Sequence, residues 1–438
     1  MCWPAFYNRY PLLYPDSIGY IEDGRPTFFA LFHHSAVNAM RSEFYSLGIF
    51  LFHWNHTVWP VVALQAVLTA YVLWLVVRAF VPRRTIHYYL AIIAGLSLLT
   101  SASWYVSLIM PDILGALVYL CFYLLLFVRE SLSRGERVAL SLIAVWGITA
   151  HATHLMLAAG VCVLLGLLYL FRWSPLARRG RELVQIMGLV VVAAAAQVSL
   201  HAWLYGHATL SGNHPPYLMA RIIADGPGAL YLRQNCAHLD WAICMDVNRL
   251  PDNDDDFLWD PAGVWATADE ATQRRLKAEE MPLILATLRA YPREQMAVSF
   301  GNFVHQFNDF GVNDFDNNTW MQGALDGALP GASAAYQRSL QARSVVPTNA
   351  FSILQRWMVI PSGLVIVGLL PWLIRRRRDR VLGLLGIVVP VLVANAFVTA
   401  VLSSSDSRYQ ARIIWLVPLV AALVVLDHFK PIVPRGTI

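Results

Sequence analysis

Residues 58–81 read VWPVVALQAVLTAYVLWLVVRAFV, an apolar run that carries one charged residue, Arg78, close to its end. A helical run of this length covers the hydrocarbon core of a bilayer, which is about 30 Å thick and needs about 20 residues. Similar runs recur along the chain, whose 438 residues are 57% apolar and only 14% charged. This composition, with a mean hydropathy of +0.50, exceeds what a soluble domain needs. We therefore predict an all-α polytopic membrane protein.

About nine runs are candidates to cross the membrane. They are residues 58–81, 88–110, 113–128, 138–150, 155–171, 183–205, 357–374, 381–402 and 413–426. The runs at 138–150 and 413–426 are shorter than the roughly 17 residues that a crossing usually needs. The predicted count is therefore uncertain by one or two.

Basic residues follow alternate runs. They are Arg78, Arg83 and Arg84 after the first; Arg129, Arg134 and Arg137 after the third; Arg172, Arg178, Arg179 and Arg181 after the fifth; and Arg375 to Arg378 with Arg380 after the seventh. Because Lys and Arg of short loops stay in the cytoplasm, these loops are predicted to be cytoplasmic. Residues 1–57, 206–356 and 403–412 are then extracytoplasmic, which is periplasmic in a bacterial inner membrane. Membrane topology also explains the net charge of +5, so no nucleic-acid partner is predicted.

This topology divides the chain into four parts: residues 1–57, a first extracytoplasmic loop; 58–205, a transmembrane core; 206–356, an extracytoplasmic domain; and 357–438, a C-terminal transmembrane part. Within the first loop, residues 44–54 are predicted to form an interfacial amphipathic helix. A translocated N-terminal loop with no leader sequence predicts that a further helix precedes it. In the alternative interpretation, a segment within the first loop itself crosses the membrane.

The inserted domain, 206–356, is expected to be mainly helical, most clearly at 268–288 and 294–307. Cys236 and Cys244 are close in sequence and predict a disulfide in an oxidising compartment. Zinc is less favoured, because this single pair with His238 between its members is an incomplete ligand set. The acidic run 252–256 lacks the Gly and Glu of a calcium-binding loop and predicts a solvated turn.

Ionisable residues gather in the predicted extracytoplasmic loops. The candidates are Asp16, Tyr20 and Arg25 in the first loop, Asp112 after Pro111, His151 and His154 between the fourth and fifth spans, and Arg408 with Tyr409 in the last loop. A carboxylate beside a wet cavity can act as a general base, and an arginine can hold a phosphate through paired charged hydrogen bonds. Together these groups predict transfer from a phosphate-activated donor.

Each candidate also has a purely structural interpretation. Asp16 and Asp112 could cap helices. His151 and His154 lie on one helical face and could hydrogen-bond the backbone at a tight hairpin, which we favour over metal binding. The pair Arg408-Tyr409 could anchor the chain at the membrane interface.

Four short elements carry a resemblance to a known group of enzymes: Asp16-x-x-x-Tyr20, Arg25-Pro26, Pro111-Asp112 and Asp406-Ser407-Arg408-Tyr409. They resemble the GT-C superfamily of polyprenyl-phosphate-sugar-dependent glycosyltransferases, most nearly the aminoarabinose transferase and protein O-mannosyltransferase groups. The resemblance covers mainly residues 10–200 and 406–424. It implies that Asp16 is the catalytic base and that Arg408 and Tyr409 lie near the donor phosphate. The chain departs from the pattern at Ser17, where those groups usually carry a second acid.

The predicted function is extracytoplasmic transfer of a sugar from a polyprenyl-phosphate donor to a lipid, glycan or protein acceptor, with inversion. Arg25 and Asp112 are expected to orient hydroxyl groups. No cofactor is required by the sequence, although a divalent metal is compatible with it. The alternative is a transporter or flippase of lipid-linked sugars; ionisable groups at one membrane face and the lack of a visible inverted repeat argue against it.

Overall fold

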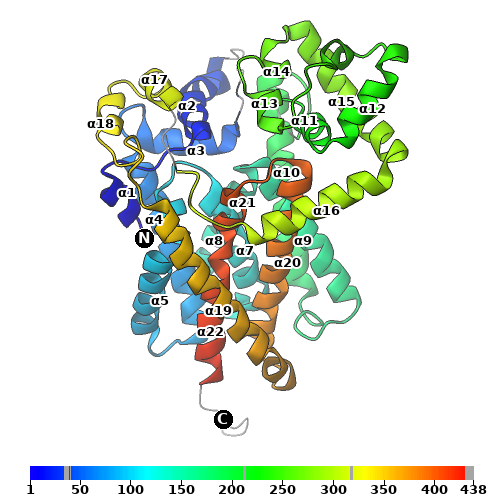
Figure 1. The fold of residues 1–438 in the computed structure, drawn as a ribbon. Helices are drawn as coiled ribbons and strands as arrows, with labels where there is room; N and C mark the ends of the chain where they lie inside the picture. Colours follow the sequence, from blue (N-terminus) through cyan, green and yellow to red (C-terminus); the bar gives the residue numbers. More distant parts are fainter. Residues whose placement is uncertain (34–38, 40, 211–213, 316–318, 430–438) are drawn as a thin grey trace. The chain divides into compact units, whose positions relative to one another are not determined.

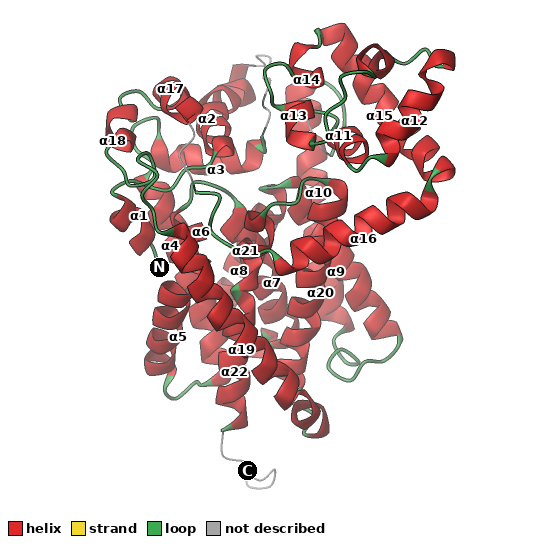
Figure 2. Cartoon of the chain, viewed as in Figure 1, coloured by secondary structure: helices red, strands yellow, loops and turns green. Residues whose placement is uncertain are grey.

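The computed structural model describes residues 1–33, 39, 41–210, 214–315 and 319–429 (Figure 1). In these ranges every regular element is a helix, which confirms the predicted all-helical class (Figure 2). The chain divides into two compact units. Residues 1–212, 310–392 and 410–438 form the first unit, and residues 213–309 and 393–409 form the second.

The helices of the first unit come from both ends of the chain. They are α1 (Trp3–Asn8), α2 (Pro15–His33), α3 (Glu43–His53), α4 (Trp59–Phe80), α5 (Thr85–Leu99), α6 (Ala102–Ser107), α7 (Asp112–Phe127), η1 (Arg129–Ser131), α8 (Arg134–Thr149), α9 (Ala152–Leu170), α10 (Gly180–Tyr205), α17 (Thr319–Ala328), α18 (Ser333–Gln337), α19 (Thr348–Arg375) and α22 (Leu416–His428). Two further helices, α20 (Asp379–Leu402) and α21 (Ser407–Ile414), have residues in both units.

Within the described residues, six helical segments are long and apolar enough to cross a membrane: α4, α9, α10, α19, α20 and the stretch Ser407–His428 that contains α21 and α22. This number is typical of an integral membrane protein. The last stretch has 22 residues, so it is longer than the apolar run 413–426 suggested. Each of the nine predicted spans is helical over most of its length, but α5 and α7 are shorter apolar helices, and the run 88–110 is split into α5 and α6.

Helix α7 lies inside the first unit, because all 16 of its residues are buried. It packs against α4, α8, α9 and α10. Helix α4 also contacts α22, and α19 packs along α22 (Figure 1). A helix surrounded by other helices need not match the bilayer thickness at a lipid-facing surface, which explains why α7 can be short.

The helix ends next to the basic loops lie close to one another in the first unit. Arg78 at the end of α4 pairs with Glu136 at the start of α8 at 2.7 Å. Arg179 donates a hydrogen bond to the carbonyl of Leu126 at the end of α7, at 2.9 Å. Arg380 of α20 donates to the carbonyl of Ala79 at 3.1 Å. These contacts join helix ends whose loops the sequence analysis assigned to the same side of the membrane.

Helix α3 covers most of the predicted interfacial segment 44–54. Ser42 caps its start by accepting from the backbone N–H of Tyr45, and Trp54 ends it in a left-handed conformation. Leu51, Phe52 and Trp54 are exposed. The other face packs on α2, α4 and α8 and includes the buried Glu43, Ser46 and His53. The exposed residues of this helix are therefore apolar, and its place at the membrane interface stays a prediction.

Residues 310–356, which the sequence analysis assigned to the inserted domain, belong to the first unit. The amide of Gln341 donates to the carbonyl of Leu13 at 2.6 Å and accepts from its N–H at 3.1 Å. The ring of Phe315 stacks on Trp104 with centroids 5.7 Å apart. These contacts join segments hundreds of residues apart, which hydrophobic periodicity does not reveal.

The second unit is helical as predicted. Its complete helices are α11 (Tyr217–Ala224), α12 (Pro227–Asn235), η2 (Cys236–His238), η3 (Ala242–Asp246), α13 (Asp254–Leu258), α14 (Val264–Thr267), α15 (Glu270–Ala290) and α16 (Pro292–Asn308). Met219, Leu276 and Leu283 belong to its core. Cys236 and Cys244 form the predicted disulfide.

The acidic run 252–256 is not a solvated turn but the start of α13. The side chain of Asn253 accepts a hydrogen bond from the N–H of Asp255 at 2.8 Å and so caps this helix. Asp254 is buried and pairs with Arg221 at 3.5 Å. Burial raises the pKa of Asp254 in spite of this arginine. Acidic residues in a first helical turn are favoured by the helix dipole, and this preference accounts for the run.

Candidate functional site

Asp16 lies in the first turn of α2 and forms an ion pair with Arg41. Its Oδ1 is 2.5 Å from Arg41 Nη2, and the two side chains are 20% and 21% exposed. Gly19, one turn along the helix, makes room for Arg41, because a Cβ atom there would lie 3.1 Å from Arg41 Cγ. The predicted base is therefore a solvent-accessible carboxylate held by a cation that the sequence analysis did not single out.

Tyr20 lies one turn beyond Asp16 and is buried. Its ring meets that of Tyr45 edge-on, with centroids 4.9 Å apart. The Tyr45 hydroxyl donates to Gln65 Oε1 at 3.0 Å, and Gln65 Nε2 donates to the carbonyls of Val106 and Leu108. Tyr20 thus packs on a polar ladder that joins α2, α3 and α4.

Tyr45, in the middle of this ladder, is fully buried. Burial raises the pKa of Tyr45 well above its usual value, and the neighbouring Tyr20 and Asp112 raise it further. The phenol is therefore neutral at physiological pH and acts as a hydrogen-bond donor.

Asp112 is the first residue of α7 and makes no capping bond; Pro111 holds the N-cap position. Its Oδ1 lies 3.4 Å from Arg412 Nη1, and the two side chains are 2% and 1% exposed. Arg412 Nη2 also donates to Thr153 Oγ1 at 3.3 Å. This buried group joins α7, α9 and α21, and it explains Asp112 better than the capping interpretation does.

His151 and His154 make the hairpin hydrogen bonds that the sequence indicated. His151 precedes α9 and its Nδ1 accepts from the N–H of Thr153 at 3.2 Å. His154 is buried, and its Nδ1–H donates to the carbonyl of Gly147 at 2.8 Å. Its Nε2 faces α7, where a Cβ atom at Gly115 would lie 2.8 Å away.

Two buried polar atoms of this group have no hydrogen-bond partner among the described residues, Asp112 Oδ2 and His154 Nε2. A carboxylate oxygen and an imidazole nitrogen can both accept a proton or a hydrogen bond. Across the described part of the chain, no group of three or more His, Cys, Asp or Glu residues is placed to hold a metal ion.

Arg25 does not join this cluster. It is exposed on α2, with its guanidinium 5.9 Å from the ring centroid of Phe29. Nine residues correspond to about two and a half turns of an α-helix, so Arg25 and Asp16 lie on opposite sides of α2. The role expected for Arg25 at the same site is not supported by this position.

Arg408 and Tyr409 belong to the second unit. The guanidinium of Arg408 lies 4.8 Å from the ring centroid of Tyr409, and the arginine is only 5% exposed. Its backbone N–H donates to Asp406 Oδ1 at 2.9 Å. The amide of Gln306 on α16 bonds both the N–H and the carbonyl of Asp406, each at 2.8 Å. Burial of Arg408 is unlike an interfacial anchor, which keeps its charge in water.

A second acidic group in the first unit was missed by the sequence analysis. Glu43, at the start of α3, is buried, and its Oε1 accepts a hydrogen bond from the Tyr205 hydroxyl. Its Oε2 lies 3.2 Å from His201 Nε2, while His201 Nδ1 lies 2.7 Å from the carbonyl of Thr209. Both ring nitrogens face acceptors, so an imidazolium satisfies them best. A histidine inside an apolar span was the signal that could have revealed this group.

The first unit thus brings together five predicted residues, Asp16, Tyr20, Asp112, His151 and His154. It adds Arg41, Tyr45 and Arg412 to them. The unit thus holds one carboxylate and arginine pair that is partly exposed, a packed pair of tyrosines, and a second carboxylate and arginine pair in the interior. Comparison of the chain with known protein families, curated proteins and solved structures gave no match.

Proposed function

We propose that this protein is an integral membrane glycosyltransferase that takes a sugar from a polyprenyl-phosphate donor on the extracytoplasmic side, with Asp16 as the general base. The observation that carries the proposal is the Asp16 carboxylate, which is 20% exposed and fixed by Arg41 at 2.5 Å. A base must be reachable by substrate and held in one orientation. Asp16 meets both requirements.

The proposed topology is the one expected from the sequence, with about nine crossings. The three short helices α5, α7 and α8 cross within the bundle of longer ones. Helices α2 and α3 then lie over the extracytoplasmic helix ends, where the side chain of Ser42 bonds the carbonyl of Thr149 at the end of α8 at 2.8 Å. In a bacterial host this site faces the periplasm.

In the proposed reaction an acceptor hydroxyl gives its proton to Asp16 as its oxygen attacks the anomeric carbon of the donor. The bond from that carbon to the phosphate oxygen breaks, and polyprenyl phosphate leaves with the electron pair. The anomeric configuration inverts, because attack and departure occur on opposite faces and one base suffices. Arg41 orients the carboxylate. The donor-phosphate role of Arg408 stays a prediction of the sequence analysis.

Asp112 and Arg412 have a supporting role in this proposal. Their pair is buried between α7, α9 and α21, where it fixes the helix ends beneath the tyrosine ladder. A buried charge pair inside a helical bundle is also found along the polar paths of transporters. This observation keeps the flippase alternative as the second candidate.

One experiment separates the two functions. Purified protein is given a polyprenyl-phosphate-mannose labelled in the lipid, together with an extract of bacterial membranes as the source of the acceptor hydroxyl, and release of labelled polyprenyl phosphate is followed. The same donor carrying other sugars is assayed in parallel. A transferase releases polyprenyl phosphate, whereas a flippase only moves intact donor between the leaflets of proteoliposomes.

The matched variants are Asp16→Asn and Glu22→Gln. Both remove one negative charge from α2, but Glu22 is exposed and lies outside the cluster. We expect Asp16→Asn to lower release by about 100-fold or more, as loss of a general base does, and Glu22→Gln to leave it near the wild-type rate. Normal release by Asp16→Asn in a correctly inserted protein would rule out this base.

A further inference from the structure

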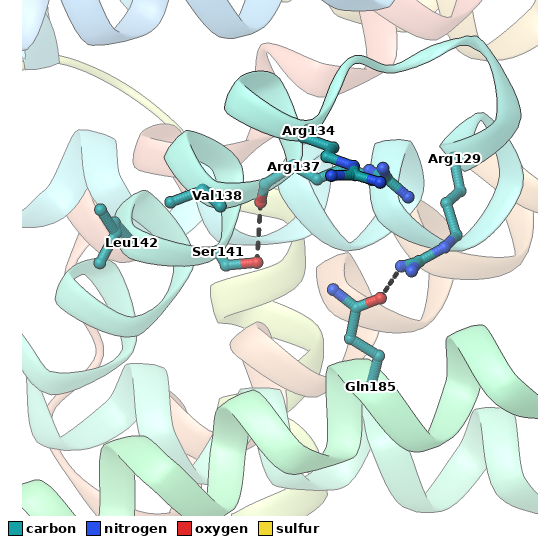
Figure 3. Close-up of a pocket in the computed structure, with 7 residues that line it drawn as sticks. All are labelled: Arg129, Arg134, Arg137, Val138, Ser141, Leu142 and Gln185. Carbon is teal, nitrogen blue, oxygen red and sulfur yellow. Dashed lines mark hydrogen bonds between the residues drawn. The ribbon is translucent and has the colours of Figure 1, made fainter.

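A pocket of about 420 Å³ opens in the first unit between η1, α8 and α10 (Figure 3). Three arginines line it, Arg129 of η1 and Arg134 and Arg137 of α8, together with Gln185 of α10. We call this site the arginine pocket. It lies at the helix ends that the basic loops mark, and so on the predicted cytoplasmic side, away from the proposed transfer site.

The charge of the arginine pocket is not balanced by acids. Arg129 donates a hydrogen bond to Gln185 Oε1, a neutral group (Figure 3). Glu136, in the first turn of α8, is engaged elsewhere by Arg78 at 2.7 and 3.0 Å. Among the residues that the structure describes, no carboxylate lies within ion-pair distance of any of the three pocket arginines. A cavity that holds three guanidinium groups and no acid is complementary to an anion.

The pocket continues into an apolar surface. Val138 and Leu142 also line it and are 59% and 66% exposed. With Arg134 they are spaced four residues apart along α8, so the three side chains share one helix face. The arginine stands at the start of this face and the apolar side chains follow (Figure 3). This order suits an amphiphile with an anionic head and a hydrocarbon chain.

We propose that the arginine pocket binds the phosphate of an anionic phospholipid, whose acyl chain lies along Val138 and Leu142. Guanidinium groups bind phosphate oxygens through paired, charge-assisted hydrogen bonds. Basic pockets between helices on the cytoplasmic side select anionic headgroups. A choline headgroup would place a cation against the three arginines, so a zwitterionic lipid binds less well. The proposal does not depend on the transferase function.

The test uses the full chain in neutral detergent micelles, which carry no surface potential, and titrates it with short-chain phosphatidylglycerol. Arg134→Gln/Arg137→Gln removes two pocket charges. Arg83→Gln/Arg84→Gln is the matched control, because it removes two exposed charges from a basic loop that does not line the pocket. We expect the first variant to bind about 25-fold more weakly, since each cation contributes about fivefold. The control should stay within about twofold of wild type.

Titrations with other ligands and with a third variant identify what the pocket binds. We expect Leu142→Ser, which keeps all three arginines, to weaken binding of phosphatidylglycerol and to leave binding of inorganic phosphate unchanged. Phosphatidylcholine that binds as tightly as phosphatidylglycerol would overturn the anion assignment, as would an equal loss in the control variant. Inorganic phosphate that binds as tightly as the lipid would assign the pocket to a free anion and overturn the lipid. Binding is the readout throughout, so failure of the transferase proposal leaves this test intact.

Discussion

At the scale of single residues, the polar side chains of the first unit are arranged by burial. Asp16 and Arg41 remain about one-fifth exposed, whereas Asp112 and Arg412 are almost fully buried. Exposure leaves a carboxylate accessible to substrate, but a buried charge must be matched by its partner. The two pairs therefore have different expected responses to mutation.

We expect Arg412→Met to lower the free energy of unfolding by about 3–5 kcal/mol, because it leaves the buried Asp112 carboxylate without its cation. The double variant Asp112→Leu/Arg412→Met removes both charges and should recover much of this loss. Thermal unfolding of the detergent-solubilised variants measures both effects. A double variant as unstable as the sum of the two single variants would show that the side chains do not interact.

His53 predicts a pH dependence of stability. Burial at the end of α3 lowers its pKa to about 4, and its neutral Nδ1 accepts a hydrogen bond from the N–H of Asn55 at 3.1 Å. The unfolded histidine titrates near 6.5. Between these values only the unfolded state binds the proton, so stability is complete above about pH 6.5 and falls as the pH drops toward 4.

Protonation of His53 lowers the free energy of unfolding by at most about 3 kcal/mol. The variant His53→Asn offers an oxygen acceptor but does not titrate in this range. Its melting temperature should change less between pH 7 and pH 4.5 than that of the wild type. Equal slopes in the two proteins would contradict the assignment.

At the scale of elements, close helix packing depends on a few glycines. Gly147 of α8 faces α7, where a Cβ atom would lie 2.6 Å from Val118 Cγ2 and 3.2 Å from the carbonyl oxygen of Leu114. Gly160 of α9 has nothing within 4 Å of such an atom. Replacement of glycine by alanine therefore tests helix packing at position 147 and helix propensity at position 160.

We expect Gly147→Ala to destabilise the protein by about 1–3 kcal/mol, since overpacking forces α7 and α8 apart. Gly160→Ala should be neutral or slightly stabilising, because alanine favours a helix over glycine. Melting temperatures of the two variants in one detergent give the comparison. Similar melting temperatures for both would mean that the contact between α7 and α8 relaxes without cost.

At the scale of the whole molecule, the chain combines apolar helices with a compact helical unit that contains the disulfide between Cys236 and Cys244. The alternation of basic loops predicts that Arg83 is cytoplasmic and that Met245, an exposed residue of the second unit, is extracytoplasmic. In a protein with Cys2, Cys121 and Cys162 replaced by Ala, a new cysteine at either position reports its side. A membrane-impermeant maleimide applied to intact spheroplasts should label position 245, and label position 83 only after lysis. Labelling of both before lysis would refute the topology.

Apolar run length by itself determined where the long apolar helices lie, because a segment buried in lipid must satisfy its own backbone hydrogen bonds. The short spacing between Cys236 and Cys244 likewise predicted their disulfide. The tertiary structure alone decided that Arg41 pairs with Asp16, that Arg412 pairs with Asp112, 300 residues away, and that residues 310–356 belong to the first unit. Periodicity and spacing describe a segment and its immediate surroundings, whereas the partner of a buried charge depends on how distant segments pack.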